Sequence, residues 1–241
     1  MSISSLGAPQ LAEYWSLLED VEVDLGTGPG GPLVLSRPGQ RLHIDAPGKL
    51  LREAVRRMQL GAVTLRNVVP DFPEYDTPEA KPGTTARQLV ADLQKLGGMT
   101  VRTLDAGGRP LLSFVPVRPD ARLVPRPLDG VPGQSLRLVG TALRRPYGAS
   151  LESAASRYRA QFHGPHALAL LARLRHRDAL PTTPVASAAV AYLHAAKFLL
   201  WDSKPQVKAD SSNSTRQSAQ LGWHSLGGVT SPLEEHMRGE L

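Results

Sequence analysis

Few residues in this sequence combine a catalytic residue type with the spacing that catalysis requires. His163 and His166 lie three positions apart, but the Gly-Pro between them indicates a turn, and no carboxylate or third histidine lies close in the sequence to complete a metal site. Segment 26–31 is rich in glycine, yet it contains a proline, precedes an expected strand and lacks the Gly-Lys-Ser/Thr of a phosphate-binding loop. We therefore interpret it as a hairpin turn.

Nucleophilic catalysis also lacks its usual residues. The chain has no cysteine, which excludes a thiolate nucleophile and a Cys-type metal site, and it has no Gly-x-Ser-x-Gly motif. Glu234, Glu235 and His236 are adjacent near the C-terminus without the spacing of a known site. Catalysis needs preorganised groups on rigid elements. We therefore expect no catalytic residue, no metal site and no catalysis by this chain alone.

The composition is that of a globular protein. The 241 residues are 41% hydrophobic and 21% charged, which suffices for one large or two small domains with a buried core. No apolar run approaches the roughly 20 residues that span a membrane. The first residues lack the basic and apolar regions of a signal peptide. We expect a soluble, cytoplasmic protein with no membrane partner.

Positive charge is concentrated in the middle of the chain. Residues 101–200 hold 14 basic and 5 acidic side chains, whereas residues 1–100 hold 10 and 12. Such a basic segment favours an anionic partner, either nucleic acid or an acidic peptide. An ordinary solvated surface rich in arginine would give the same pattern.

Apolar spacing predicts two similar series of elements. Alternation at period two predicts strands, and apolar residues three or four apart predict helices. An amphipathic segment, 11–18, opens the chain. The first series has strands at 21–25, 32–36 and 41–45, helical segments at 48–60, 63–69 and 84–96, and a hairpin of 99–104 with 109–115. The second has strands at 136–145, 150–153 and 157–162 and helices at 165–176 and 185–200.

Three strands, two or three helices and a closing hairpin are typical of a winged helix. We therefore predict an α+β protein with tandem winged-helix-like modules, in each of which a three-stranded antiparallel sheet packs on helices. The proline-rich stretch between the two series indicates a linker, and the serine-rich end indicates a polar tail. The predicted divisions are 1–117, 118–133, 134–201 and 202–241.

Several segments resemble one enzyme family, the streptolysin-type, FMN-dependent azoline dehydrogenases of thiazole/oxazole-modified peptide and thiopeptide biosynthesis. The resemblance covers about 45–200 and lies in the family's non-catalytic N-terminal half. It is carried by 56–68 (RRMQLGAVTLRNV), 93–104 (LQKLGGMTVRTL), 109–117 (RPLLSFVPV), 143–145 (LRR), 151–163 (LESAASRYRAQFH) and 165–171 (PHALALL). Segment 220–231 (QLGWHSLGGVTS) weakly resembles the connector that leads into the family's flavin domain.

The departures from the family determine what the resemblance implies. In the family, a nitroreductase-fold domain that binds FMN follows the connector, and these 241 residues leave no room for one. No flavin-contacting residue can be carried over, so we expect no cofactor on this chain alone. The resemblance implies a non-catalytic subunit whose FMN is on, or shared with, a flavin-bearing dehydrogenase partner. Leu221, Trp223, His224 and Leu226 form an apolar group that we expect to contact this partner.

The resemblance also implies a second partner, the leader segment of a precursor peptide. In related peptide-recognition modules the leader adds as an extra strand beside the three-stranded sheet, against the third helix. The matching surfaces here are strand 41–45 with helix 87–96, and strand 157–161 with helix 185–200. The expected peptide-binding residues are Arg41, His43, Asp45, Arg87, Arg157, Arg159 and Gln161. Arg157 and Arg159 would face one side and meet acidic side chains of the leader.

Two other functions remain open at this point. A winged-helix DNA-binding regulator would explain the basic middle, but helix 84–96 has only Arg87 and Lys95 as basic residues against Asp92, so nucleic acid is the less favoured partner. A self-sufficient flavoenzyme, with 136–241 as a reduced flavin fold, would need elements that the sequence lacks.

Overall fold

The computed structural model describes residues 10–28, 30–70, 83–126, 135–178 and 182–202. Helices and antiparallel strands alternate through these ranges, so the predicted α+β class is confirmed. The described residues all belong to one compact unit. None of the described helices is long and apolar enough to cross a membrane.

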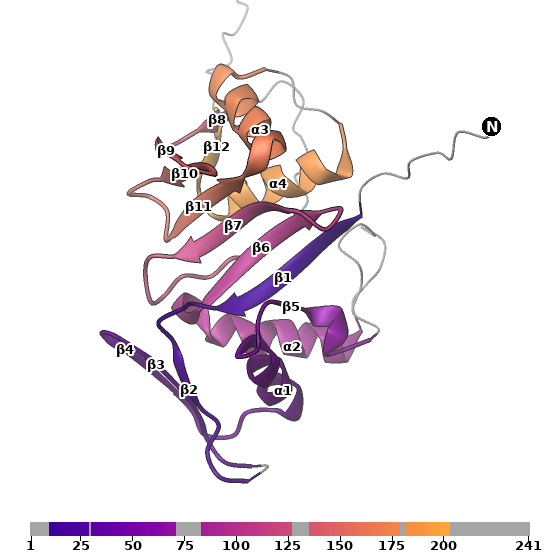
Figure 1. Cartoon of the computed structure of the whole chain (residues 1–241), viewed down its shortest axis with the longest axis vertical. Helices are drawn as coiled ribbons and strands as arrows, with labels where there is room; N and C mark the ends of the chain where they lie inside the picture. The colour runs from indigo at the N-terminus through magenta and orange to yellow at the C-terminus, as the bar shows by residue number, and fades with distance from the viewer. Residues whose placement is uncertain (1–9, 29, 71–82, 127–134, 179–181, 203–241) are drawn as a thin grey trace, which may run out of the picture. The chain divides into compact units, whose positions relative to one another are not determined.

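A seven-stranded antiparallel sheet runs through both halves of the described chain (Figure 1). Its strands lie in the order β5-β1-β6-β7-β11-β10-β9. Their bounds are β5 Val63–Thr64, β1 Leu11–Leu17, β6 Thr100–Ala106, β7 Pro110–Pro116, β11 Tyr158–His163, β10 Gly148–Glu152 and β9 Thr141–Arg145. Since β7 of the first half pairs with β11 of the second, one sheet crosses the predicted division between 117 and 134.

The β6–β7 hairpin at the centre of this sheet forms where the sequence predicts it. Gly107 and Gly108 have positive φ values of 65° and 78°, which glycine adopts without steric cost. The Asp105 carboxylate accepts a hydrogen bond from the Gly108 amide at 2.7 Å and closes the turn. The amphipathic segment 11–18 becomes strand β1, which pairs with β6 over its whole length.

A second, three-stranded sheet packs on the first two helices. It contains β2 (Glu22–Asp24), β3 (Leu33–Arg37) and β4 (Gln40–Ile44), in that order. The helices are α1 (Lys49–Met58) and α2 (Thr84–Lys95), and Figure 1 shows them beside this sheet. Leu33 and Leu35 of β3 are fully buried with Leu51, Val55 and Leu89 of the helices, in what we call the first core.

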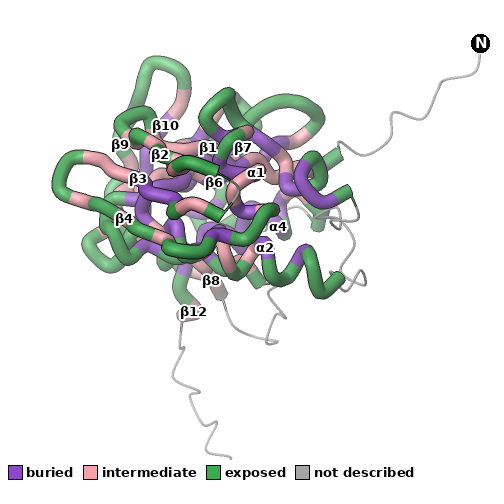
Figure 2. The backbone as a smooth tube through the Cα atoms, turned by 90° about the horizontal axis from the view of Figure 1, so that it is seen from below, coloured by how far each residue is buried: buried purple, intermediate pink, exposed green. Residues whose placement is uncertain are grey.

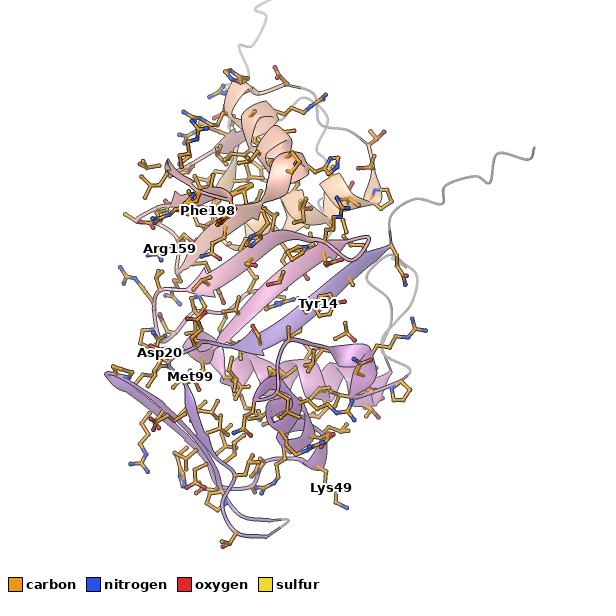
Figure 3. The ribbon with its side chains drawn as sticks, viewed as in Figure 1. Tyr14, Asp20, Lys49, Met99, Arg159 and Phe198 are labelled. Atoms are coloured by element: carbon orange, nitrogen blue, oxygen red, sulfur yellow. The ribbon has the colours of Figure 1, made fainter. Side chains whose placement is uncertain are left out.

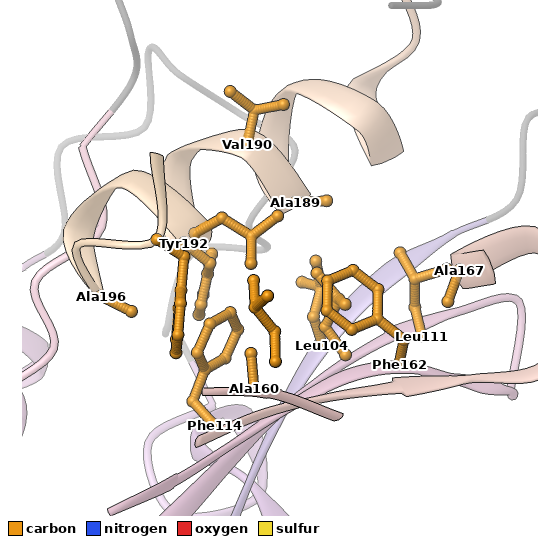
Figure 4. Packing of buried hydrophobic residues seen from close by; sticks show 14 of the residues in the cluster. Leu104, Leu111, Phe114, Ala160, Phe162, Ala167, Ala189, Val190, Tyr192 and Ala196 are labelled. Atoms are coloured by element: carbon orange, nitrogen blue, oxygen red, sulfur yellow. The ribbon is translucent and has the colours of Figure 1, made fainter. Parts of the chain in front are cut away.

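The second half adds two helices and a two-stranded ribbon. Helices α3 (Gly164–His176) and α4 (Pro184–Ala195) cover the sheet around β7, β10 and β11, and β8 (Ser135–Leu138) pairs with β12 (Leu199–Asp202). Figure 4 shows Phe114, Ala160 and Phe162 of the sheet packed beneath α4 in a second core, with Phe114 beside Tyr192 of that helix. Figure 2 shows buried residues on the packed strands and helices and exposed residues in many of the turns.

Several predicted boundaries are corrected by the structure. Segment 63–69 contains strand β5 and a 3-10 helix, Leu65–Asn67, in place of a helix throughout. Strand 136–145 divides at Gly140, whose φ of 121° bends the chain so that β8 pairs with β12 and β9 with β10. Helix 185–200 ends at Ala195, because Lys197 has a φ of 63° and the apolar residues after it join β12.

The tandem winged-helix arrangement is not confirmed. Each half does place three consecutive antiparallel strands before two helices, β2–β4 before α1 and α2, and β9–β11 before α3 and α4. The strands of the second half, however, extend the larger sheet instead of forming a sheet of their own. Part of the predicted linker is also packed, since Ala121 and Leu123 are buried in the second core.

Candidate peptide-binding site

One side of the β4 backbone has no neighbouring strand in the part of the chain that the structure describes. It pairs with β3 on one side, and it is the outermost strand of the three-stranded sheet (Figure 1). Its side chains alternate: Leu42 and Ile44 pack against the first core, whereas Arg41 and His43 are exposed. The ring nitrogen Nδ1 of His43 lies 3.3 Å from the Asp45 carboxylate. Three of the predicted peptide-binding residues therefore lie together on an open edge.

The register of β4 indicates which backbone groups face outward. A two-residue turn, Pro38–Gly39, joins β3 to β4, and Arg37 is opposite Gln40. Pairs that exchange backbone hydrogen bonds alternate along an antiparallel ladder, beginning with the pair that flanks such a turn. The amide and carbonyl groups of Gln40, Leu42 and Ile44 thus face β3. Those of Arg41 and His43 face outward, where an added strand would bind.

Contacts behind the edge hold the three-stranded sheet in place. Arg37, at the end of β3, donates to the Asp20 carboxylate at 2.9 Å and to the Gly98 carbonyl at 3.2 Å. On the opposite side, the Arg52 guanidinium of α1 donates to the carbonyls of Leu25, Gly28 and Gly31 in the turn between β2 and β3. These hydrogen bonds from Arg37 and Arg52 fix the three-stranded sheet to neighbouring segments of the chain. The β4 edge therefore belongs to a sheet that is held in place.

Arg87 is placed apart from the β4 residues. It is exposed in the first turn of α2, and among the described residues no hydrogen bond or ion pair joins it to Arg41, His43 or Asp45. The structure therefore does not bring Arg87 into the edge, although its charge has the same sign as that of Arg41.

The predicted strand addition at 157–161 is wrong. Strand β11 pairs with β7 on one side and with β10 on the other, so its backbone groups are already used. Arg157 lies 2.8 Å from the Asp120 carboxylate, and Arg159, labelled in Figure 3, lies 2.7 Å from that of Glu152. The sequence pattern identified the strand and its arginines, but alternation carries no information about neighbouring strands.

Gln161 belongs instead to a polar row across the larger sheet. This row contains Tyr14, Thr103, Ser113, Gln161 and Ser150, which are opposite one another on adjacent strands. Thr103 and Ser113 share a hydroxyl hydrogen bond of 2.8 Å, and the Ser113 hydroxyl is 2.9 Å from Nε2 of His163. Burial lowers the pKa of His163 below its ordinary value of 6.5.

The Ser113–His163 contact has the distance of a nucleophile and base. Among the described residues, however, no carboxylate forms an ion pair with His163, and Ser113 is buried. The contact is therefore best explained as part of the hydrogen bonding of the sheet. Sequence reasoning missed Ser113 because its alternation with buried apolar residues resembles that of any half-buried strand.

A buried cluster around Arg102 joins the two cores. The Arg102 guanidinium pairs with the Glu13 carboxylate, donates to the Leu123 carbonyl and donates to the Tyr192 hydroxyl at 3.3 Å. It also lies 4.4 Å from the centre of the Trp15 ring and 5.2 Å from that of Tyr192. Burial opposes its charge, but Glu13 and Tyr192 outweigh burial and raise the pKa of Arg102. This cluster positions the sheet and does not reach the β4 edge.

The predicted partner-binding residues Leu221, Trp223, His224 and Leu226 lie outside the described residues. Their role stays a prediction. No protein-family model and no curated protein matches this sequence.

Proposed function

We propose that this protein is a non-catalytic, peptide-binding subunit of a heteromeric FMN-dependent azoline dehydrogenase. It binds the leader segment of a precursor peptide as an added strand on β4, and a flavin-bearing partner supplies FMN and the oxidation chemistry. The proposal places both proteins in the cytoplasm. The observation that carries it is the outer edge of β4, which no described strand occupies and where the backbone groups of Arg41 and His43 face outward.

The elements around β4 support this assignment. The series β2–β4, α1, 3-10 helix and α2 has the order of a winged-helix-like peptide-recognition module, and we assign the leader to this first module. The series β9–β11, α3 and α4 would be the second module, built into the larger sheet. The family resemblance over about 45–200 supports both the leader and the flavin-bearing partner.

The positive charge of Arg41 on β4 favours an acidic residue in the leader. Main-chain hydrogen bonds to an added strand give affinity with little sequence preference, and the adjacent side chains select the peptide. Arg41 and His43 lie two positions apart on the exposed face of β4. An acidic residue of the peptide would meet Arg41, and a polar residue two positions along would meet the His43 ring. Asp45 at the end of the strand would disfavour acid there and so help to fix the register.

Strand addition can be separated from simple charge attraction. His43→Pro removes an outward amide but leaves the β3–β4 ladder intact. We expect it to weaken binding of a fluorescein-labelled acidic leader peptide by on the order of tenfold in fluorescence anisotropy. Arg41→Glu should weaken binding similarly. Lys49→Glu, an equal charge change at an exposed position of α1, is the matched control and should have little effect.

Two results would contradict the proposal. Equal binding by wild type and His43→Pro would exclude strand addition at β4. If duplex DNA binds with a steep salt dependence and the leader peptide does not bind or displace it, the DNA-binding regulator would be favoured. The flavin-bearing partner is tested separately by co-purification: a yellow complex is expected, and a mixture that neither associates nor retains colour would exclude this partner.

A further inference from the structure

Strand β9 forms a second edge, at the end of the seven-stranded sheet, where no strand among the described residues pairs with it. It pairs with β10 on one side and is the last strand in the sheet order (Figure 1). Thr141, Leu143, Arg144 and Arg145 are exposed along it, with Leu143 at 40%. Tyr147, in the turn that leads to β10, is 93% exposed. A sheet edge with unpaired backbone N–H and C=O groups can accept another strand.

One backbone hydrogen bond fixes which groups of β9 face outward. The Val117 amide donates to the Arg157 carbonyl at 2.9 Å, so Arg157 and every second residue after it face β7. Tyr158, Ala160 and Phe162 then face β10. The same alternation applies to β10. The register between β9 and β10 then places the backbone amide and carbonyl groups of Leu143 and Arg145 toward β10. The amide and carbonyl groups of Ala142 and Arg144 therefore face outward.

The charges around β9 favour an acidic occupant. Arg144 and Arg145 point to opposite faces of the sheet, and no described carboxylate forms an ion pair with either. Arg145 contacts the Ser150 hydroxyl at 3.3 Å. The nearest carboxylate on β10, that of Glu152, is paired with Arg159. Two cationic side chains at one edge attract acidic residues on both faces of an added strand.

A second copy of this chain fits the edge less well. Two β9 strands paired to each other would bring arginines of like charge close together, and like charges on paired strands are destabilising. The same repulsion protects the edge from uncontrolled association. The charge pattern therefore separates an acidic peptide, which it attracts, from a second copy, which it repels.

We infer that β9 binds an extended acidic peptide segment as an eighth strand of the sheet. The outward groups of Ala142 and Arg144 form the backbone hydrogen bonds, Arg144 and Arg145 bind the acidic side chains, and Leu143 contacts an apolar residue of the segment. This edge is distinct from β4, and the inference does not depend on the function proposed for β4.

Binding of a defined peptide to single-site variants tests this inference. The probe is a fluorescein-labelled octapeptide, Glu-Glu-Val-Val-Glu-Glu-Val-Val, which places Glu on both faces of an added strand. All proteins carry His43→Pro to block the β4 edge. Ala142→Pro removes one outward amide from β9 and should weaken binding by on the order of tenfold. Ala142→Val keeps the amide and should bind as the parent does. Arg144→Glu with Arg145→Glu should abolish binding.

A second measurement does not depend on how well Ala142→Pro folds. The same octapeptide with an N-methyl group on every residue has no backbone N–H to donate from either edge, and it should bind the unaltered β9 edge at least about tenfold more weakly. Equal binding of the two peptides, or of Ala142→Pro and its parent, would overturn strand addition. Equal binding of a Lys-Val octapeptide would overturn the acidic occupant. A protein dimer that Ala142→Pro converts to monomer would assign the edge to a second copy and overturn the inference.

Discussion

Arg102 is the residue on which the junction of the two cores depends. Its side chain is 9% exposed and that of Glu13 is 14% exposed, so both charges are largely withdrawn from water. A buried pair of this kind adds little net stability compared with apolar residues, but removal of one partner leaves an uncompensated charge. The Trp15 indole N–H, which has no hydrogen-bond partner among the described residues, is buried beside the same guanidinium.

Arg102→Met is therefore expected to lower the free energy of unfolding by about 3 kcal/mol, because Glu13 loses its partner. Urea unfolding followed by circular dichroism measures this loss. The double variant Glu13→Gln with Arg102→Met should be more stable than Arg102→Met alone, since glutamine needs no counter-charge. Arg109→Met, at an exposed position on the same hairpin, is the control and should change stability little. A loss equal to that of the control would show that the pair is dispensable.

At the scale of the element, α1 is stabilised by charges within its own turns. Glu53 lies 2.8 Å from Nε of Arg56 and 2.6 Å from Nε of Arg57, the spacings of neighbours on one helix face. Hydrogen bonds from these two arginines lower the pKa of Glu53 to about 2. The ordinary pKa of a Glu carboxyl is 4.5. As the pH falls, Glu53 therefore takes up its proton at a higher pH in the unfolded chain than in the folded chain.

The contribution of Glu53 to stability should consequently depend on pH. It is complete above about pH 4.5 and is lost as the pH falls toward about 2, because protonation removes the pairing that only the folded state makes. The difference in unfolding free energy between wild type and Glu53→Gln should shrink across this range. Carbon NMR of the Glu53 carboxyl should give a midpoint near 2. A midpoint near 4.5 would mean that these pairs do not persist in solution.

The sequence predicted those helices, strands and turns whose residue pattern lies within a few positions of the chain. Strands β2–β4, helices α1–α3 and the β6–β7 hairpin depend on alternation, helical spacing and turn residues within a few positions, and each occurs near its expected place. The errors occur where long-range pairing overrides the local pattern. Leu199 and Leu200 continue the apolar spacing of α4, but they pair with Leu138 and Arg137 and become a strand.

For the whole molecule, the sequence pattern could not predict which strands pair with each other. Trp15 lies opposite Arg102, and Phe114 lies opposite Ala160, across long stretches of chain. Alternation shows that these residues share a buried face, but any other buried strand would satisfy it equally. The β4 edge could be proposed from a sequence resemblance. The interior position of β11, and hence the edge at β9, required the sheet order.

The continuous sheet predicts that both cores unfold together. Strands β6, β7 and β11 connect them, and Arg102 contacts Trp15 in the first core and Tyr192 in the second. The chain has no cysteine, so single thiols can report on each core. Val55→Cys in α1 and Val190→Cys in α4 are matched substitutions at buried positions. Their thiols should become reactive to a brief pulse of maleimide at the same urea concentration, after correction for the stability of each variant. Midpoints that stay apart would mean that the halves unfold as independent domains, because a shared cooperative sheet cannot expose one core while it protects the other.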